Sequence, residues 1–232
     1  MKAAQRIVFT SVAIGMLLSF CSVGCNPLGI FTFTAYLTGA DLEERIAFKF
    51  PQDTKRVAVI TYSPYSARQE MGPVDRELND RVSRRIADYF DSKRMRYKKE
   101  VVLASKVQQF QNEHPDWVKW EKGEIGRALK VDYLVYVDIQ SLSLYEEASH
   151  RTLYKGHAEL TVSVVRILPD SQETVFNGKF IVVDYPTKLR SVPTSDITLP
   201  RFREGFIEAI SKQVSWLFTP HETGDTFDHS DF

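Results

Sequence analysis

The sequence predicts an α/β fold, a single compact sandwich in which helices pack on a mixed sheet of parallel and antiparallel strands. Three observations predict it. Strand and helix patterns alternate through the first half of the folded region, two long strand patterns follow around a turn, and 43% of all residues are apolar. The predicted domain, residues 51–218, has the length of one domain.

The first half of the domain alternates β-branched strands with amphipathic helices. Residues 56–62 (RVAVITY) form a run short enough to be a strand buried on both faces. After a connecting loop over residues 63–72, residues 74–94 carry apolar side chains at three- and four-residue spacing, which predicts a helix. The same patterns predict a strand over 97–103, helices over 105–112 and 119–130, and a strand over 132–139. Strands joined by such crossovers run parallel.

The second half of the domain predicts a hairpin and a closing helix. Residues 154–168 alternate apolar and polar side chains, and residues 174–185 return as the partner strand after a turn. Residues 186–198 are either an ordinary connection or a loop that faces a partner. A helix over 200–218 follows, with proline in its first turn, and residues 219–232 form a polar tail.

The amino terminus has the order of charge, apolar core and small residues that a secretory signal peptide has. Lys2 and Arg6 precede the apolar residues 7–20, which are too few to span a bilayer core comfortably. The following Ser-Val-Gly-Cys resembles the bacterial lipobox, although leucine is more usual at the position of its serine. The resemblance implies a signal peptide over 1–24 and an acylated amino-terminal cysteine, Cys25, which would carry palmitate and hold the protein on a membrane.

Two alternatives remain open for this segment: a plain signal peptide, or an uncleaved anchor that continues through residues 28–37. Asn26, Pro27 and Gly29 interrupt such an anchor, so we expect a membrane-proximal tether over residues 25–50. In bacterial lipoproteins, aspartate after the acylated cysteine is the usual signal for retention in the inner membrane. Asn26 therefore favours the periplasmic face of the outer membrane of the cell envelope.

Charge and cysteine content exclude several functions. Removal of residues 1–24 leaves 28 basic residues against 30 acidic ones, a net charge of −2, so no overall attraction to nucleic acid is expected. Cys21 would leave with the signal peptide and Cys25 would be acylated. The mature protein would then have no thiol for a disulfide, a nucleophile or a metal.

One segment carries a family resemblance. Residues 124–135 (EIGRALKVDYLV), together with the strand at 57–60 and the helix after it, resemble curli-secretion lipoproteins, lipoprotein activators of penicillin-binding proteins and the amino-terminal domain of TolB. The resemblance implies a TolB-like fold and an envelope setting, with Gly126 letting a helix approach the sheet and Asp132 joining helix to strand. It implies no catalytic residue, because these families act by binding and assembly. The transmembrane hairpin of the curli pore has no counterpart here, so pore formation is not expected.

The sequence offers no recognisable catalytic or cofactor motif. It lacks a phosphate-binding glycine loop, a HExxH pair and a G-x-S-x-G elbow, and its five histidines are scattered. We therefore predict no enzyme activity, no cofactor and no metal site. The leading hypothesis is a non-catalytic lipoprotein that binds another protein or assembles with copies of itself. The alternatives are an envelope hydrolase that uses residues 63–68 with a histidine, and a subunit of a secretion channel.

Five aromatic or basic residues are candidates for partner binding: Tyr62, Tyr65, Arg68, Trp117 and Trp120. The first three follow the carboxyl end of a buried strand, where ligands tend to bind in open α/β sheets. An ordinary loop remains the alternative for these three, and packing in the core remains the alternative for the two tryptophans.

Overall fold

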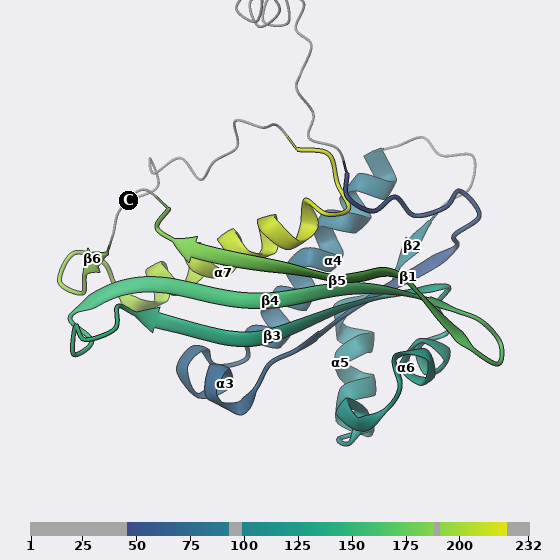
Figure 1. Cartoon of the computed structure of the whole chain (residues 1–232), viewed down its shortest axis with the longest axis horizontal. Helices are drawn as coiled ribbons and strands as arrows, with labels where there is room; N and C mark the ends of the chain where they lie inside the picture. The colour runs from purple at the N-terminus through teal and green to yellow at the C-terminus, as the bar shows by residue number, and fades with distance from the viewer. Residues whose placement is uncertain (1–45, 93–98, 188–190, 222–232) are drawn as a thin grey trace, which may run out of the picture. The chain divides into compact units, whose positions relative to one another are not determined.

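The computed structural model describes residues 46–92, 99–187 and 191–221 (Figure 1). Contacts divide the chain into two units, residues 1–43 and 44–232, and all described residues belong to the second unit. The predicted signal peptide, Cys25 and most of the tether lie outside the described residues, as does the chain beyond His221. No helix within the described ranges has both the length and the apolarity that a membrane crossing requires.

A mixed sheet of six strands forms the centre of the second unit, in the order β2-β1-β3-β4-β5 with β6 paired to β4. β1 pairs in parallel with both β2 and β3, whereas β4 is antiparallel to β3, β5 and β6. This confirms the predicted mixed sheet. The strands are β1 (Arg56–Tyr62), β2 (Glu100–Val101), β3 (Tyr133–Tyr145), β4 (Leu153–Ile167), β5 (Gln172–Tyr185) and β6 (Val192–Pro193).

Helices pack on both faces of the sheet, as predicted for the sandwich. α4 and α7 lie together on one face, behind the long strands β3, β4 and β5 in Figure 1. α5 and α6 lie on the other face, against β1 and the adjoining parts of β3 and β4. The helices are α3 (Tyr65–Met71), α4 (Val74–Ser92), α5 (Ala104–Glu113), the 3₁₀ turn η2 (Trp117–Lys119), α6 (Lys122–Leu129) and α7 (Leu199–Ser215).

The larger core lies between the sheet and the helices α4 and α7. The apolar stripe predicted for residues 74–94 and the apolar side chains of α7 are buried in it, and β4 contributes every second residue. At Gly156 of β4 a Cβ atom would lie 2.7 Å from the ring of Phe206, so only glycine lets α7 come this close. Phe48 and Phe50, within the predicted tether, also pack here. The buried residues from α4, α7 and β4 include Leu78, Val82, Ile86, Phe202, Phe206, Ile210, Ala158, Leu160, Val162 and Val164.

The smaller core lies on the opposite face, and two residues of the 124–135 segment shape it. A side chain at Gly126 of α6 would collide with Ile167 of β4, so glycine lets this helix approach the sheet. The Asp132 carboxylate accepts hydrogen bonds from the backbone N–H groups of Lys55 and Arg56, at 2.7 and 2.9 Å. These two bonds fix the start of β1 beside the start of β3, which sets the register of the parallel pair.

The structure differs from the sequence-based expectation in several places. Residues 63–72, expected to form a loop, contain the helix α3, because Ala67 and Met71 lie one turn apart and are both buried. β3 continues to Tyr145 rather than ending at residue 139, since polar residues occupy the solvent-facing positions of its second half. Of the strand predicted over 97–103, the described residues form a strand only at Glu100–Val101. The helix predicted over 105–112 begins at Ala104, the one predicted over 119–130 begins at Lys122, and the stretch 186–198 includes the short strand β6.

Candidate functional site

One face of the sheet is covered for only part of its area. α6 packs on the start of β3 and the end of β4, and the described helices leave the rest of that face exposed (Figure 1). We call the uncovered part the open sheet face. Pairing in register places its side chains in rows, because residues directly opposite each other point to the same side of a sheet. Its members are Asp138, Gln140, Ser141, Ser143, Lys155, His157, Glu159, Thr161, Phe180, Val182 and Asp184.

Two large apolar side chains lie on the open sheet face. Phe180 is 50% exposed and Val182 is 47% exposed, and both belong to β5, whose one sheet partner among the described strands is β4. Apolar side chains gathered on an edge strand form a surface to which another chain can add, through apolar contact and backbone hydrogen bonds. This part of the face therefore has the chemistry of a protein-docking surface.

A group of partly desolvated polar side chains lies where α6 meets the open sheet face. The Lys122 ammonium, from the first turn of α6, donates to the hydroxyl of Ser163 at 2.9 Å and lies 4.5 Å from the centre of the Tyr136 ring. Burial lowers the pKa of Lys122, and the nearby charge of Asp138 partly offsets this. Burial also raises the pKa of the Tyr136 phenol to about 12, so the phenol stays protonated at neutral pH.

Asp138 is the least well stabilised member of this polar group. Burial raises the pKa of its carboxyl, which the Lys122 ammonium opposes, and no hydrogen-bond donor among the described residues reaches it. An ionised carboxylate that is partly desolvated and lacks a donor disfavours folding. Such groups gather at functional sites, where a ligand or partner supplies the missing contact.

Polar contacts order the rest of the open sheet face. His157 lies between two carboxylates, with Nδ1 2.8 Å from Asp184 and Nε2 3.6 Å from Glu159. Glu159 also accepts a hydrogen bond from Ser141 at 3.1 Å. Both ring nitrogens therefore face carboxylates rather than a hydroxyl nucleophile. No group of three or more metal-ligating side chains with suitable geometry occurs among the described residues.

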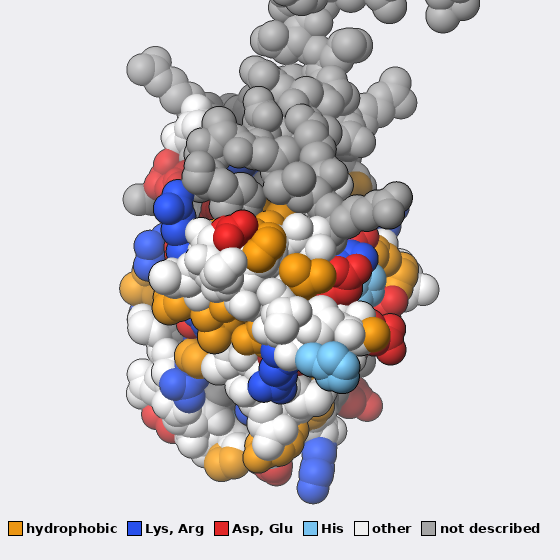
Figure 2. Space-filling model, turned by 90° about the vertical axis from the view of Figure 1, so that its left-hand side faces the viewer, with side chains coloured by type: hydrophobic (Ala, Val, Ile, Leu, Met, Phe, Trp, Pro, Cys, Tyr) orange, Lys and Arg blue, Asp and Glu red, His pale blue; other side chains and the backbone are white. Residues whose placement is uncertain are grey.

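Surface charge on the face shown in Figure 2 is mixed. Acidic and basic side chains are interspersed with apolar ones, and no continuous area of one sign forms on the part of that face that is described. This face therefore lacks the field that would steer a highly charged ligand.

The structure brings three of the five predicted binding residues close to the smaller core. Tyr62 is the last residue of β1 and pairs with Asp138 of β3 in the parallel register. Its ring contacts the Trp117 ring edge-on, with the two ring centroids 6.3 Å apart. Trp117 is only 7% exposed, and Trp120 packs against the ring of Phe110. Trp117 is therefore a core residue, and Tyr62 borders the polar group around Asp138.

The other two predicted binding residues lie elsewhere. Tyr65 and Arg68 are on α3, which packs on the larger core through Met71. Both are exposed, Tyr65 at 70%. Because α3 belongs to the opposite core from Trp117, the five candidates do not form one continuous site.

Sequence reasoning missed the residues that define the open sheet face. The run Phe180-Ile181-Val182-Val183 is apolar at four successive positions, although β5 covers a core on one face. That run was a usable signal, because a strand at the edge of a sheet with one solvent face should alternate. Lys122 and Asp138 had no such signal, since only the fold brings them together.

Comparison with known proteins does not assign a family. No protein-family model matches the chain, and no curated protein matches it. Similar solved structures include the hypothetical protein CT253 from Chlamydia trachomatis, with 16% identity, a TM-score of 0.33 and coverage of 69% of this chain and 97% of that one. A PelC dodecamer from Paraburkholderia phytofirmans has 8% identity, a TM-score of 0.39 and coverage of 76% and 97%. The lipoprotein GNA1162 from Neisseria meningitidis has 8% identity, a TM-score of 0.39 and coverage of 69% and 98%. Likenesses at these scores carry no functional assignment.

Replacement of Asp138 tests whether its ionised carboxylate destabilises the folded protein. Because its pKa is higher in the folded protein than in the unfolded chain, its contribution to stability is full at acidic pH and is lost as the pH rises through the folded pKa. Asp138→Asn is therefore expected to raise the Tm at pH 7 and to leave it unchanged at about pH 3, below the ordinary pKa of about 3.9. Thermal unfolding at both pH values measures this.

The matched control is Asp170→Asn, which changes an exposed carboxylate in the turn between β4 and β5 and should leave the Tm unchanged at both pH values. A lower Tm for Asp138→Asn at pH 7 would show that attraction to Lys122 outweighs desolvation, and would remove Asp138 as a sign of a functional site.

Proposed function

We propose that this chain is a lipid-anchored, non-catalytic module of the bacterial cell envelope that binds a protein partner, or a second copy of itself, through the open sheet face. The observation that carries the proposal is the exposure of Phe180 and Val182 of β5 on a sheet face that the described helices leave uncovered. The partly desolvated Asp138 of β3 lies on the same face, separated from Phe180 by Thr161 of β4. Exposed apolar side chains next to polar groups are typical of a protein interface.

The anchor in this proposal is Cys25, which lies outside the described residues. The apolar run, the small residues before the cysteine and the likeness to the lipobox support acylation at this position. Each buried CH₂ of an acyl chain contributes about 0.8 kcal/mol, so several chains would hold the domain at the bilayer. Asn26 after the acylated position supports the periplasmic face of the outer membrane.

The side-chain geometry supports binding over hydrolysis. A serine hydrolase needs its hydroxyl in contact with a base. Ser63, from the loop that the hydrolase hypothesis invoked, is 2% exposed and its hydroxyl has no hydrogen-bond partner among the described residues. His157 faces Asp184 and Glu159, and His114 packs on the rings of Phe110 and Trp120.

Removal of the acylated thiol tests the anchor. Radiolabelled palmitate is expected to label the wild-type protein and not Cys25→Ser, and the serine variant should leave the membrane fraction, because without acyl chains only weak surface contact remains. Cys21→Ser is the matched control and should retain both label and membrane location. Equal labelling of Cys25→Ser and wild type would contradict acylation at Cys25.

A charge on the open sheet face tests the interface. Val182→Asp places a carboxylate in the apolar part of this face and is expected to weaken partner binding about tenfold, the effect of losing a central apolar contact. The measurement is quantitative affinity recovery of partner from detergent-solubilised membranes, with light scattering to detect self-association. Leu103→Asp, which changes a 65% exposed apolar side chain just before α5, is the control and should bind as the wild type does. Equal binding by Val182→Asp and wild type, or an equal loss in the control, would place the interface elsewhere.

A further inference from the structure

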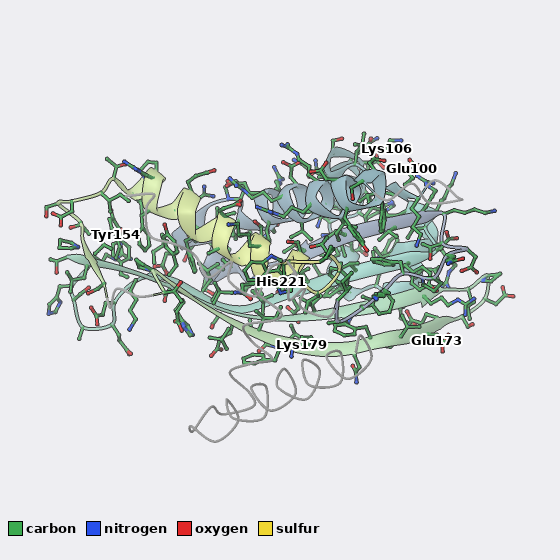
Figure 3. All side chains as sticks on the ribbon, turned by 90° about the horizontal axis from the view of Figure 1, so that it is seen from above. Glu100, Lys106, Tyr154, Glu173, Lys179 and His221 are labelled. Carbon is green, nitrogen blue, oxygen red and sulfur yellow. The ribbon has the colours of Figure 1, made fainter. Side chains whose placement is uncertain are left out.

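A pocket of about 260 Å³ lies between β5 and the end of α7, and it shares Phe180 with the open sheet face. Lys179, Phe180 and Ile181 of β5 form one side, and Trp216 and Leu217, which follow α7, form the other. Ala47, Gln213 and His221 also line the pocket. Figure 3 labels Lys179 and His221. The volume is slightly below that of a site for a drug-sized molecule, and it suits a headgroup with a few attached carbons.

The pocket combines a cation at its rim with an apolar floor. Lys179 is exposed, and no carboxylate among the described residues pairs with it. Ile181 and Leu217, each 8% exposed, supply the apolar floor. Trp216 stacks on the His221 ring, with centroids 4.6 Å apart and planes 12° apart, so an aromatic wall stands opposite the strand. A molecule with an anionic head and an apolar tail is complementary to this arrangement.

The pocket also lies where the chain enters the folded domain. Ala47 lines it, and the N–H of the next residue, Phe48, donates to the carbonyl of Leu217 at 2.9 Å, which ties the entering chain to the end of α7. In the anchored protein, this entry point is the described part of the domain that is nearest to Cys25 along the chain. Tryptophan and lysine are typical of surfaces that meet lipid headgroups.

We propose that this pocket binds the headgroup of an anionic phospholipid in the membrane that carries the anchor. Lys179 would meet the phosphate, and the first acyl carbons would lie against Ile181 and Leu217. The contact would hold the domain against the bilayer and so leave the open sheet face in one orientation for its partner. This inference rests on the proposed membrane anchoring through Cys25.

The test uses the full lipidated protein in vesicles of brominated phosphatidylcholine, with or without brominated phosphatidylglycerol. Bromine quenches nearby tryptophan, and the difference between wild type and Trp216→Phe isolates the signal of Trp216. Quenching of Trp216 is expected to rise with phosphatidylglycerol, and Lys179→Gln should need about a fivefold higher fraction of this lipid, the effect of about 1 kcal/mol for one lysine at an anionic surface. Dissolved glycerol phosphate should not reverse the quenching if the membrane lipid is the ligand.

The matched control is Lys106→Gln, an exposed lysine on α5 near the opposite, β2 edge of the sheet, which should behave as the wild type does (Figure 3). Equal quenching with and without phosphatidylglycerol, an equal loss in Lys106→Gln, or reversal by glycerol phosphate would overturn the proposal. If quenching of Trp216 appeared only after removal of residues 222–232, the occupant of the pocket in the intact protein would be this acidic tail and not a lipid. A protein that fails to float with any vesicle would refute the anchor rather than the pocket.

Discussion

The one-sided alternation of β4 sets the rest of the structure. Leu160, Val162 and Val164 point toward α4 and α7, while Thr161 and Ser163 between them point away. Among the described helices, α3 and the long α4 and α7 pack on one face and the shorter α5 and α6 on the other, so the sheet buries its apolar side fully and its polar side in part. The open sheet face is a consequence of this alternation and of which helices pack on each side of the sheet.

Charged side chains are partly removed from water at the boundary between the covered part of the sheet and the open sheet face, which disfavours their charged forms. Lys122 enters from α6 and Asp138 from β3, and each is partly removed from water, so their pKa values move in opposite directions. Asp132, by contrast, makes two short backbone hydrogen bonds and joins β1 to β3. Asp132 thus has a structural role, because both of its backbone hydrogen bonds join strands. Asp138 receives no hydrogen bond from the described residues and lies on the open sheet face.

The sequence predicts the fold closely and the site poorly, for a physical reason. Apolar periodicity depends on local spacing, so β1 is predicted residue by residue and the helix at 74–94 ends within two residues of α4. Exposure depends on which elements cover a strand, and β5 carries apolar residues on both faces, so Phe180 and Val182 look like core until the sheet order is known. The polar group around Asp138 joins residues from α6, β3 and β4, and only the fold brings them together.

Site-specific cross-linking tests the central claim, that the open sheet face is where the protein meets its partner. A photoreactive amino acid at position 182 of β5 is predicted to form a cross-linked adduct in intact cells, while one at position 84, where the Arg84 side chain on α4 is 73% exposed, is predicted to form none. An adduct from position 84 with none from position 182 would contradict the account.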